Sequence, residues 1–288
     1  MRVGRGWYVA VSDDQESTRE RSGLDVVSCG RLHVLGDPAA TVLCGTSAAA
    51  VWDLPLPPGV QRPRGLEILA ESPQASWGGR RAYETLRRWK VPADFIVEGP
   101  HGGRVTDPLQ TALDLGRGLD LPFALVALDA ALRVTQGAGI PADVGRTLLR
   151  ERVLAAHGGR GLRGVVKAAT YADVRAESPL ESIVRGRIIE AGLPVPRPQV
   201  RVVGRSGREY RSDLGLALPG DPPGFTSLLI EADGVGKYMQ PGDLAAEKRR
   251  QHDLEGGGHR FVRVLYGEAV SAPEGFLETI GRLVAGAD

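Results

Sequence analysis

Residues 178–192 read SPLESIVRGRIIEAG, and this stretch marks the start of a folded unit. Ser178, followed three residues later by Glu181, forms a capping box, and Pro179 stands at the first helical position, where no backbone N–H is needed. Gly192 is typical of a helix end. The apolar positions between these ends share one helical face: Leu180, Ile183, Val184 and Ile188. The stretch therefore predicts an amphipathic helix that packs against a core.

The sequence beyond this helix predicts a small α/β unit. Short apolar or alternating segments predict strands, and longer polar or amphipathic segments predict helices. In chain order we expect strands at 199–203, 208–218 and 228–233, a helix at 243–255, a strand at 260–266 and a helix at 273–284. The resulting order, α-β-β-β-α-β-α, predicts the α/β fold class, with helices packed on the faces of a sheet.

Length and composition indicate two domains. The chain has 288 residues, of which 42% are hydrophobic and 25% are charged, as in ordinary globular proteins. A glycine-rich break at 157–161 and a change of composition towards residue 178 place the boundary between a domain at 1–165 and a domain at 175–288. For the first domain we expect an α+β region, with helices at 39–52, 108–116 and 122–134 and short strands at 6–11, 66–70 and 94–98.

Charge, cysteine content and hydropathy restrict the classes of protein. The 36 basic and 35 acidic residues give a net charge of +1, which by itself does not predict a nucleic-acid partner. Cys29 and Cys44 have no metal-site or redox-motif spacing, so we expect free thiols in a reducing compartment. The longest apolar run, 121–132, is interrupted by Asp129 and is too short to span a membrane. The start of the chain lacks the apolar core of a signal peptide. These features predict a cytoplasmic protein with no membrane contact.

Three acidic residues fall at informative places in the C-terminal unit. Glu181 lies in the first turn of the opening helix, Asp213 lies within the second strand and Glu231 lies near the end of the third. Neighbouring strands would bring Asp213 and Glu231 within reach of a shared hard cation, which prefers oxygen ligands. Such a pair can hold Mg²⁺ or Mn²⁺ and activate water beside a phosphate. Lys237, six residues after Glu231, is placed to stabilise charge on that phosphate.

The same region resembles a known family. Asp213, EADG (231–234), KY (237–238) and EKRR (247–250) resemble the very-short-patch-repair-like nucleases, which belong to the restriction-endonuclease-like PD-(D/E)xK superfamily. RFVRV (260–264) resembles their last core strand. The resemblance covers residues 177–266 and implies an αβββαβ core with a mixed sheet.

This resemblance also implies roles for individual residues. Asp213 and Glu231 would be metal ligands, with Asp233 next to them, and Glu181 would be an auxiliary acid near the metal. Asp233 stands where the superfamily usually has its lysine. Lys237 therefore takes over the role of that lysine, or the site is altered.

The front of the chain resembles a second group, the AbiEi-type antitoxin-like proteins of type IV toxin–antitoxin systems. The resemblance rests on RGWYV (5–9), CGTSAAA (44–50) and VTDPLQTALDL (105–115) and covers residues 1–133. Such proteins usually carry an N-terminal winged helix that binds DNA. This chain begins at what resembles the last strand of that winged domain, so either most of it is missing or the true start lies upstream.

Basic residues cluster in the C-terminal unit. Seven arginines between residues 185 and 211 are accompanied by only two glutamates, and KRR (248–250) lies on a polar helix. Such a cluster can follow a phosphate backbone, and the alternative is a solvated surface in an arginine-rich chain. The residues that we expect to contact nucleic acid are Arg185, Arg201, Arg205, Arg208, Arg211, Lys248, Arg249 and Arg250.

Each candidate catalytic residue also has a structural interpretation. Glu181 can serve only as the capping-box acid, and Lys237 can be a solvated surface lysine. Asp213 can be a solvated acid next to a turn, although it adjoins an apolar segment where an unpaired carboxylate is costly. Glu231 follows an apolar run and faces the same cost.

Two functions from different classes fit these patterns. The first is a metal-dependent DNA endonuclease that hydrolyses phosphodiester bonds, with a role in phage defence or DNA repair. The second is a non-catalytic antitoxin or DNA-binding regulator that uses the nuclease-like fold to bind DNA or a partner toxin. Asp233 and the near-zero net charge favour the second function, whereas the pair of Asp213 and Glu231 favours the first.

Overall fold

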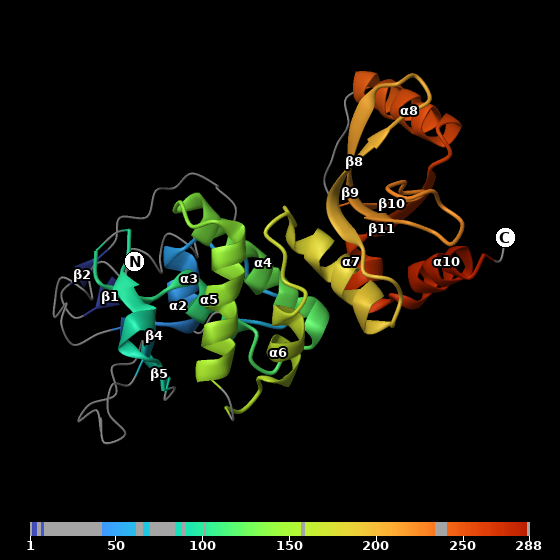
Figure 1. Ribbon diagram of the computed structural model, residues 1–288. Helices are drawn as coiled ribbons and strands as arrows, with labels where there is room; N and C mark the ends of the chain where they lie inside the picture. The colour runs from blue at the N-terminus through green and yellow to red at the C-terminus, as the bar shows by residue number, and fades with distance from the viewer. Residues whose placement is uncertain are drawn as a thin grey trace.

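The computed structural model describes residues 42–61, 66–69, 84–87, 90–100, 102–156, 159–233 and 241–286, together with the backbone of two short strands at 2–4 and 7–8. These residues form an N-terminal half of small strands and packed helices and a C-terminal half built around a second sheet (Figure 1). The α/β fold class predicted from the sequence is confirmed. No helix in the described ranges is long and apolar enough to cross a membrane.

The N-terminal half contains a five-stranded mixed sheet, in the order β5-β4-β3-β7-β6. Its strands are β3 (Val42–Leu43), β4 (Leu66–Leu69), β5 (Glu84–Arg87), β6 (Ile96–Glu98) and β7 (Arg104–Thr106). A short 3₁₀ turn, η1 (Ala93–Phe95), leads into β6. The separate pair β1 (Arg2–Gly4) and β2 (Trp7–Tyr8) is antiparallel.

Helices make up the rest of this half, and α4 is their centre. They are α2 (Gly45–Val51), α3 (Pro108–Leu115), α4 (Leu121–Gly137), α5 (Ala142–Ala155) and α6 (Arg163–Ala169). Twelve of the seventeen residues of α4 are buried, as expected of a helix that is apolar on nearly all sides. Asp107 caps α3 by accepting the backbone N–H of Gln110 at 2.8 Å, next to Pro108 at the first helical position.

The expected helix at 39–52 is wrong in its first part, because Val42 and Leu43 form strand β3 and the helix begins only at Gly45. Gly45 has a φ of +54°, and a Cβ there would lie 2.6 Å from the Glu67 carboxylate. That carboxylate, from β4, accepts the backbone N–H and the hydroxyl of Thr46, each at 2.6 Å. The helix N-terminus is therefore capped by a neighbouring strand.

The C-terminal half follows the order predicted from the sequence, with one additional short helix. Its elements are α7 (Pro179–Glu190), β8 (Arg197–Val203), β9 (Glu209–Leu216), β10 (Leu228–Asp233), α8 (Pro241–Gly256), β11 (Arg260–Leu265), α9 (Tyr266–Ser271) and α10 (Glu274–Val284). The sheet order is β11-β10-β9-β8, with β10 and β11 parallel and the other neighbours antiparallel. The unpredicted helix is α9, which begins directly where β11 ends.

Two apolar clusters hold this sheet between helices. The larger cluster joins α7, α9 and α10 to the sheet through residues such as Ile183, Leu214, Ile230 and Ile280. The smaller one joins α8 to the sheet through Leu254, Val200, Val202 and Leu229. Figure 1 shows α8 on one side of the sheet and α7 and α10 on the other. The layered arrangement therefore buries both faces.

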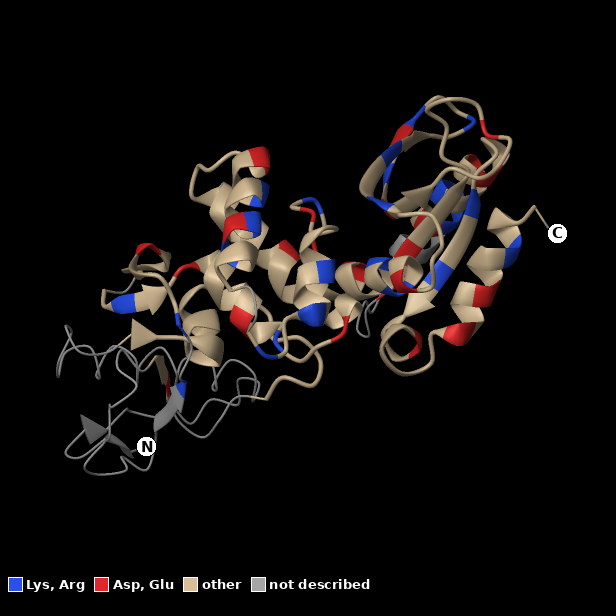
Figure 2. Cartoon of the chain, turned by 60° about the horizontal axis from the view of Figure 1, so that its bottom comes forward, with Lys and Arg blue, Asp and Glu red and all other residues tan. Residues whose placement is uncertain are grey.

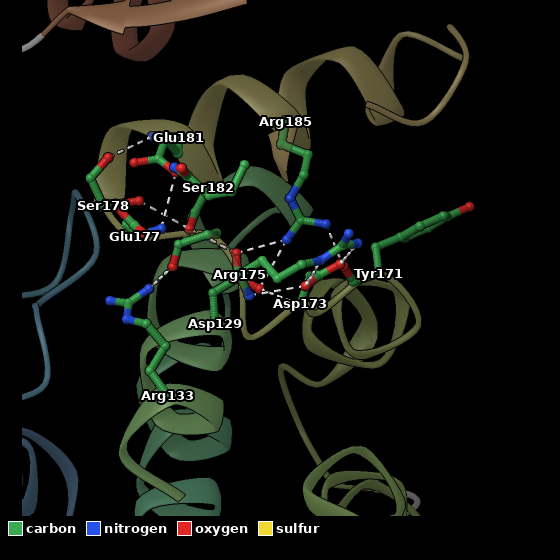
Figure 3. Close-up of polar contacts among 12 residues, drawn as sticks. Asp129, Arg133, Tyr171, Asp173, Arg175, Glu177, Ser178, Glu181, Ser182 and Arg185 are labelled. Carbon is green, nitrogen blue, oxygen red and sulfur yellow. Dashed lines mark hydrogen bonds and ion pairs between the residues drawn. The ribbon is translucent and has the colours of Figure 1, made fainter. Parts of the chain in front are cut away.

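Helices α4 and α7 join the two halves. A Cβ at Gly186, in the middle of α7, would lie 2.4 Å from the Cα of Pro122 in α4, so only glycine allows this close approach. Beside it, the fully buried guanidinium of Arg185 makes two hydrogen bonds to the Asp129 carboxylate, at 2.7 and 2.9 Å (Figure 3). Asp129 also accepts the Ser182 hydroxyl at 2.7 Å and the Asp173 backbone N–H at 2.8 Å. Burial raises the pKa of the Asp129 carboxyl, and the Arg185 charge opposes that rise.

We expect Asp129→Asn to lower the free energy of unfolding by about 3–5 kcal/mol, because it leaves the buried Arg185 charge without its counter-ion. Chemical denaturation measures the change. Asp143→Asn, an exposed acid on α5, is the matched control and should change stability by no more than about 0.5 kcal/mol. Equal stability of the two variants would contradict a structural role for the ion pair.

A second buried carboxyl, Asp114 on α3, is only partly paired. Its Oδ1 accepts hydrogen bonds from Gln110 at 3.0 Å and Arg117 at 3.1 Å, whereas its buried Oδ2 has no partner in the described part of the chain. Burial raises the pKa of Asp114 from its ordinary value of 3.8 to about 6, although these two donors oppose the rise. Cys44 is also buried, as expected for a free thiol, and its pKa is raised by burial and by the nearby Asp114 charge.

The raised pKa of Asp114 makes stability depend on pH. The folded protein holds this proton up to a higher pH than the unfolded chain, so stability falls as pH rises from about 4 to about 6. A rise of the pKa from 3.8 to about 6 corresponds to about 3 kcal/mol of stability. Asp114→Asn removes the titration, so its stability relative to the wild type should rise by up to that amount between pH 4 and pH 7.5. Denaturation of Asp120→Asn, an exposed acid, should show no such gain.

Candidate functional site

Asp213 and Glu231 lie side by side where the antiparallel ladder between β9 and β10 stops. The last backbone pair is Leu214 with Ile230, and the next position on each strand carries one of the two acids. Oδ2 of Asp213 accepts the backbone N–H of Ala232 at 2.9 Å, so a side chain replaces a main-chain acceptor at this point. Both acids are half-buried. The two residues proposed as metal ligands therefore come from neighbouring strands, as the sequence predicts.

Arg250 of α8 holds the Glu231 carboxylate in place. Oε1 of Glu231 accepts the guanidinium of Arg250 and the hydroxyl of Ser212, each at 2.8 Å. The same Nη2 of Arg250 donates to the Arg211 carbonyl at 2.9 Å. Partial burial would lower the pKa of Arg250, but its hydrogen bond to Glu231 and the charges of Glu231, Glu247 and Asp213 outweigh burial and raise it. The guanidinium thus offsets the charge of Glu231 and part of the negative charge of the acidic pair.

A more exposed layer of charges surrounds this centre. Glu247, one turn before Arg250 on α8, accepts from Arg250 at 3.3 Å and from Arg263 of β11 at 2.8 Å. Arg263 lies opposite Glu231 in the parallel ladder, and its Nη1 is 3.9 Å from the Asp233 carboxylate. Asp233 therefore faces a cation of the protein, and its expected place next to a metal stays a prediction.

Glu181 is held by its own neighbourhood. Its carboxylate accepts the backbone N–H of Glu177 at 3.0 Å and the side-chain amide of Gln199 at 2.8 Å. Its backbone N–H donates to the Ser178 hydroxyl at 3.1 Å, which confirms the N-terminal cap (Figure 3). The acid is 5% exposed and belongs to no described metal-ligand cluster. The carboxylate therefore bonds the Glu177 amide and not the Ser178 amide of the expected capping box, and it ties the start of α7 to β8.

The carboxylate oxygens of the described residues suit a cation that takes few ligands from the protein. No group of three or more histidine, cysteine, aspartate or glutamate side chains that could hold a metal occurs among them. Mg²⁺, however, is often bound by one or two carboxylates, with waters and phosphate oxygens completing its shell. Asp213 and Glu231 fit that pattern. Lys237, the proposed charge-stabilising residue, lies outside the described residues.

The expected nucleic-acid contacts divide into three groups. Arg185 is 2% exposed and bound to Asp129, so its predicted contact with nucleic acid is wrong. Arg250 is committed to Glu231. The others are exposed and stay predictions: Arg201, Arg205, Arg208, Arg211, Lys248 and Arg249.

The exposed basic residues gather on the β8–β9 hairpin and α8, where Figure 2 shows basic segments. The tip of the hairpin is fixed to α8 through Asp253. Its carboxylate accepts the backbone N–H of Ser206 at 2.8 Å, the Ser206 hydroxyl at 2.6 Å and the Tyr210 hydroxyl at 2.9 Å. The Ser206 hydroxyl is the main cause of the lowered pKa of Asp253. Basic residues of the hairpin and the helix are therefore held on one framework.

Sequence reasoning missed the residues that link the acids to one another. Ser212 carries no signal in the sequence, Glu247 stands only as part of the EKRR stretch (247–250), and the ion pair of Arg250 with Glu231 is not predicted. The spacing of Glu247 and Arg250 on one helix was an available signal, because residues three apart face each other. Gln199 gave no such signal. Its φ of +51° is uncommon for a residue other than glycine, and it places the side chain against Glu181.

Fold and site together define a two-part α/β protein with an acidic pair at a strand end. Two uncharacterized proteins of Mycobacterium tuberculosis, MT2308 from strain CDC 1551 / Oshkosh and Rv2248 from strain ATCC 25618 / H37Rv, are each 30% identical to it over 184 residues. The match covers 64% of this chain, which spans 60% of the length of these curated relatives. No protein-family model and no solved structure matches the chain.

Proposed function

We propose that the protein is a DNA endonuclease that works with Mg²⁺ or Mn²⁺ and whose active site contains Asp213 and Glu231. The observation that carries this proposal is the position of these two carboxylates at the end of the β9–β10 ladder, next to the Arg250 guanidinium. Oxygen donors of this kind bind hard cations, and the αβββαβ element order from α7 to β11 supports the proposal.

In this proposal each side chain has a separate role. Asp213 and Glu231 would hold the cation, which would supply Lewis-acid chemistry at the phosphate. Arg250 orients Glu231 through its hydrogen bond and, together with Ser212, keeps that carboxylate fixed. Lys237 stabilises negative charge on the phosphate. Glu181 supports strand β8 through Gln199 and has no chemical role.

Exposed arginines bring the DNA to the site. Arg201 lies on β8 and Arg208 lies in the turn that leads into β9, and the Arg201 side chain is 80% exposed. Arg211, on the same hairpin, is next to Ser212 and pairs with Glu177 at 2.8 Å. Such side chains neutralise phosphates without reading base sequence.

Glu231→Gln should reduce Mg²⁺- or Mn²⁺-dependent cleavage of DNA by more than ~100-fold. Mutation of a residue that only orients a metal ligand already lowers metal affinity or activity about 10–100-fold, and this change removes the charge of a ligand itself. A plasmid nicking assay measures the effect. Glu274→Gln, which removes an exposed acid of α10, is the matched control and should cleave like the wild type. Equal cleavage by Glu231→Gln and the wild type would sink the mechanism.

DNA affinity should depend on salt through the hairpin arginines. For the double variant Arg201→Gln/Arg208→Gln, we expect the slope of log K against log salt to fall by about 2. Fluorescence anisotropy of a labelled duplex over a range of salt concentrations measures that slope. The double variant Arg160→Gln/Arg163→Gln removes the same charge from another exposed surface and should keep the wild-type slope. Identical slopes for all three proteins would exclude the hairpin as the DNA surface.

The alternative is a non-catalytic antitoxin or DNA-binding regulator. The observation that favours it is that Arg250 already neutralises Glu231 and that Asp233 occupies the position of the usual lysine. Calorimetry separates the two proposals, because a non-catalytic protein would bind DNA, or a partner toxin, without taking up Mn²⁺. Uptake of one Mn²⁺ by the wild type and none by Glu231→Gln would favour the nuclease.

A further inference from the structure

A second concave site lies between the two halves, away from Asp213 and Glu231. It is a pocket of about 320 Å³ between α5, the segment 170–173 and the segment 195–198 that leads into β8. Its walls contain five arginines but only one acid. These residues are Arg146, Arg150, Arg175, Arg185, Arg197 and Asp173. A pocket with this excess of positive charge attracts anions.

Two of the five arginines are matched by carboxylates. Arg175 makes hydrogen bonds of 3.0 and 2.6 Å to Asp173, and Arg185 binds Asp129 (Figure 3). The match at Arg185 is incomplete, because its Nε, in a side chain that is 2% exposed, has no hydrogen-bond partner among the described residues. An unsatisfied donor of a buried guanidinium carries a desolvation cost that a further acceptor would relieve.

The other three arginines have no carboxylate partner among the described residues. Arg197 donates to the hydroxyl of Thr226, which carries no charge. Arg146 and Arg150 take part in no salt bridge or side-chain hydrogen bond of the described part of the chain. They are four residues apart on α5, where like charges repel each other. An anion between them would convert this repulsion into attraction.

We propose that this pocket binds the phosphate groups of a small phosphorylated molecule. Guanidinium groups match phosphate oxygens in pairs of hydrogen bonds, and three of them are uncommitted to a carboxylate here. The volume lies at the lower end of the range of ~300–1,000 Å³ found for small-ligand sites. The pocket contains none of the residues of the proposed nuclease centre, so the phosphate site and the nuclease function are tested independently.

Calorimetry of the full chain with pyrophosphate tests the site. We expect the wild type to bind it at one site at ~0.15 M salt, where weak surface attraction is screened. Arg146→Gln/Arg150→Gln should weaken binding at least about tenfold, because it removes two charged donors. Arg185 is left intact, because its loss would destabilise the junction of α4 and α7. The matched control Arg160→Gln/Arg163→Gln should bind like the wild type.

A second readout excludes a general loss of folding. Pyrophosphate should raise the unfolding temperature of the wild type and the control but not that of Arg146→Gln/Arg150→Gln. Absence of pyrophosphate binding by the wild type, or equal binding by that double variant, would overturn the site. If a DNA duplex displaced pyrophosphate and bound this double variant more weakly, the small-molecule assignment would be overturned in favour of a nucleic-acid strand.

Discussion

The buried ion pair between Asp129 and Arg185 fixes how the two halves of the protein meet. Asp129 belongs to the helix at the centre of the N-terminal half, and Arg185 belongs to the helix on which the C-terminal sheet rests. Two charges taken out of water are tolerated only if every oxygen and most N–H groups find partners. Both oxygens of Asp129 are satisfied by Arg185, Ser182 and the backbone of Asp173. The position of the β8–β11 sheet is therefore set by hydrogen-bond geometry as well as by apolar packing.

The acidic centre on that sheet also needs partners for its charged groups, although its carboxylates are only half-buried. Asp213 and Glu231 lie where the strands cease to pair, so their carboxylates meet donors that the ladder no longer uses. Arg250 supplies the compensating charge from α8. A cation bound by the two acids would share Glu231 with this guanidinium. Such a cation would be linked to α8, because both would act on one carboxylate.

Most helices and strands of the C-terminal half could be predicted from the sequence, because they begin and end at residues that act on their neighbours in the chain. The cap formed by Ser178, Pro179 and Glu181 needs only neighbours in the chain, so helix α7 could be located from sequence. The role of Arg185 could not, because its partner lies 56 residues away and its burial depends on tertiary packing. The start of α2 was misplaced for the same reason, since the cap comes from Glu67 on a strand. The acidic pair could be proposed from strand positions, but the contacts with Arg250 and Ser212 required the fold.

Strand β8 has a consequence for assembly. It is an edge strand of the described sheet, with β9 as its single neighbour. Pro198 has no N–H to offer an added strand, and the left-handed backbone of Gln199 interrupts the extended line at the next residue. The exposed Arg201 adds a charge that discourages pairing with another sheet. This edge is thus protected against strand addition and aggregation, and a binding partner has to recognise its side chains.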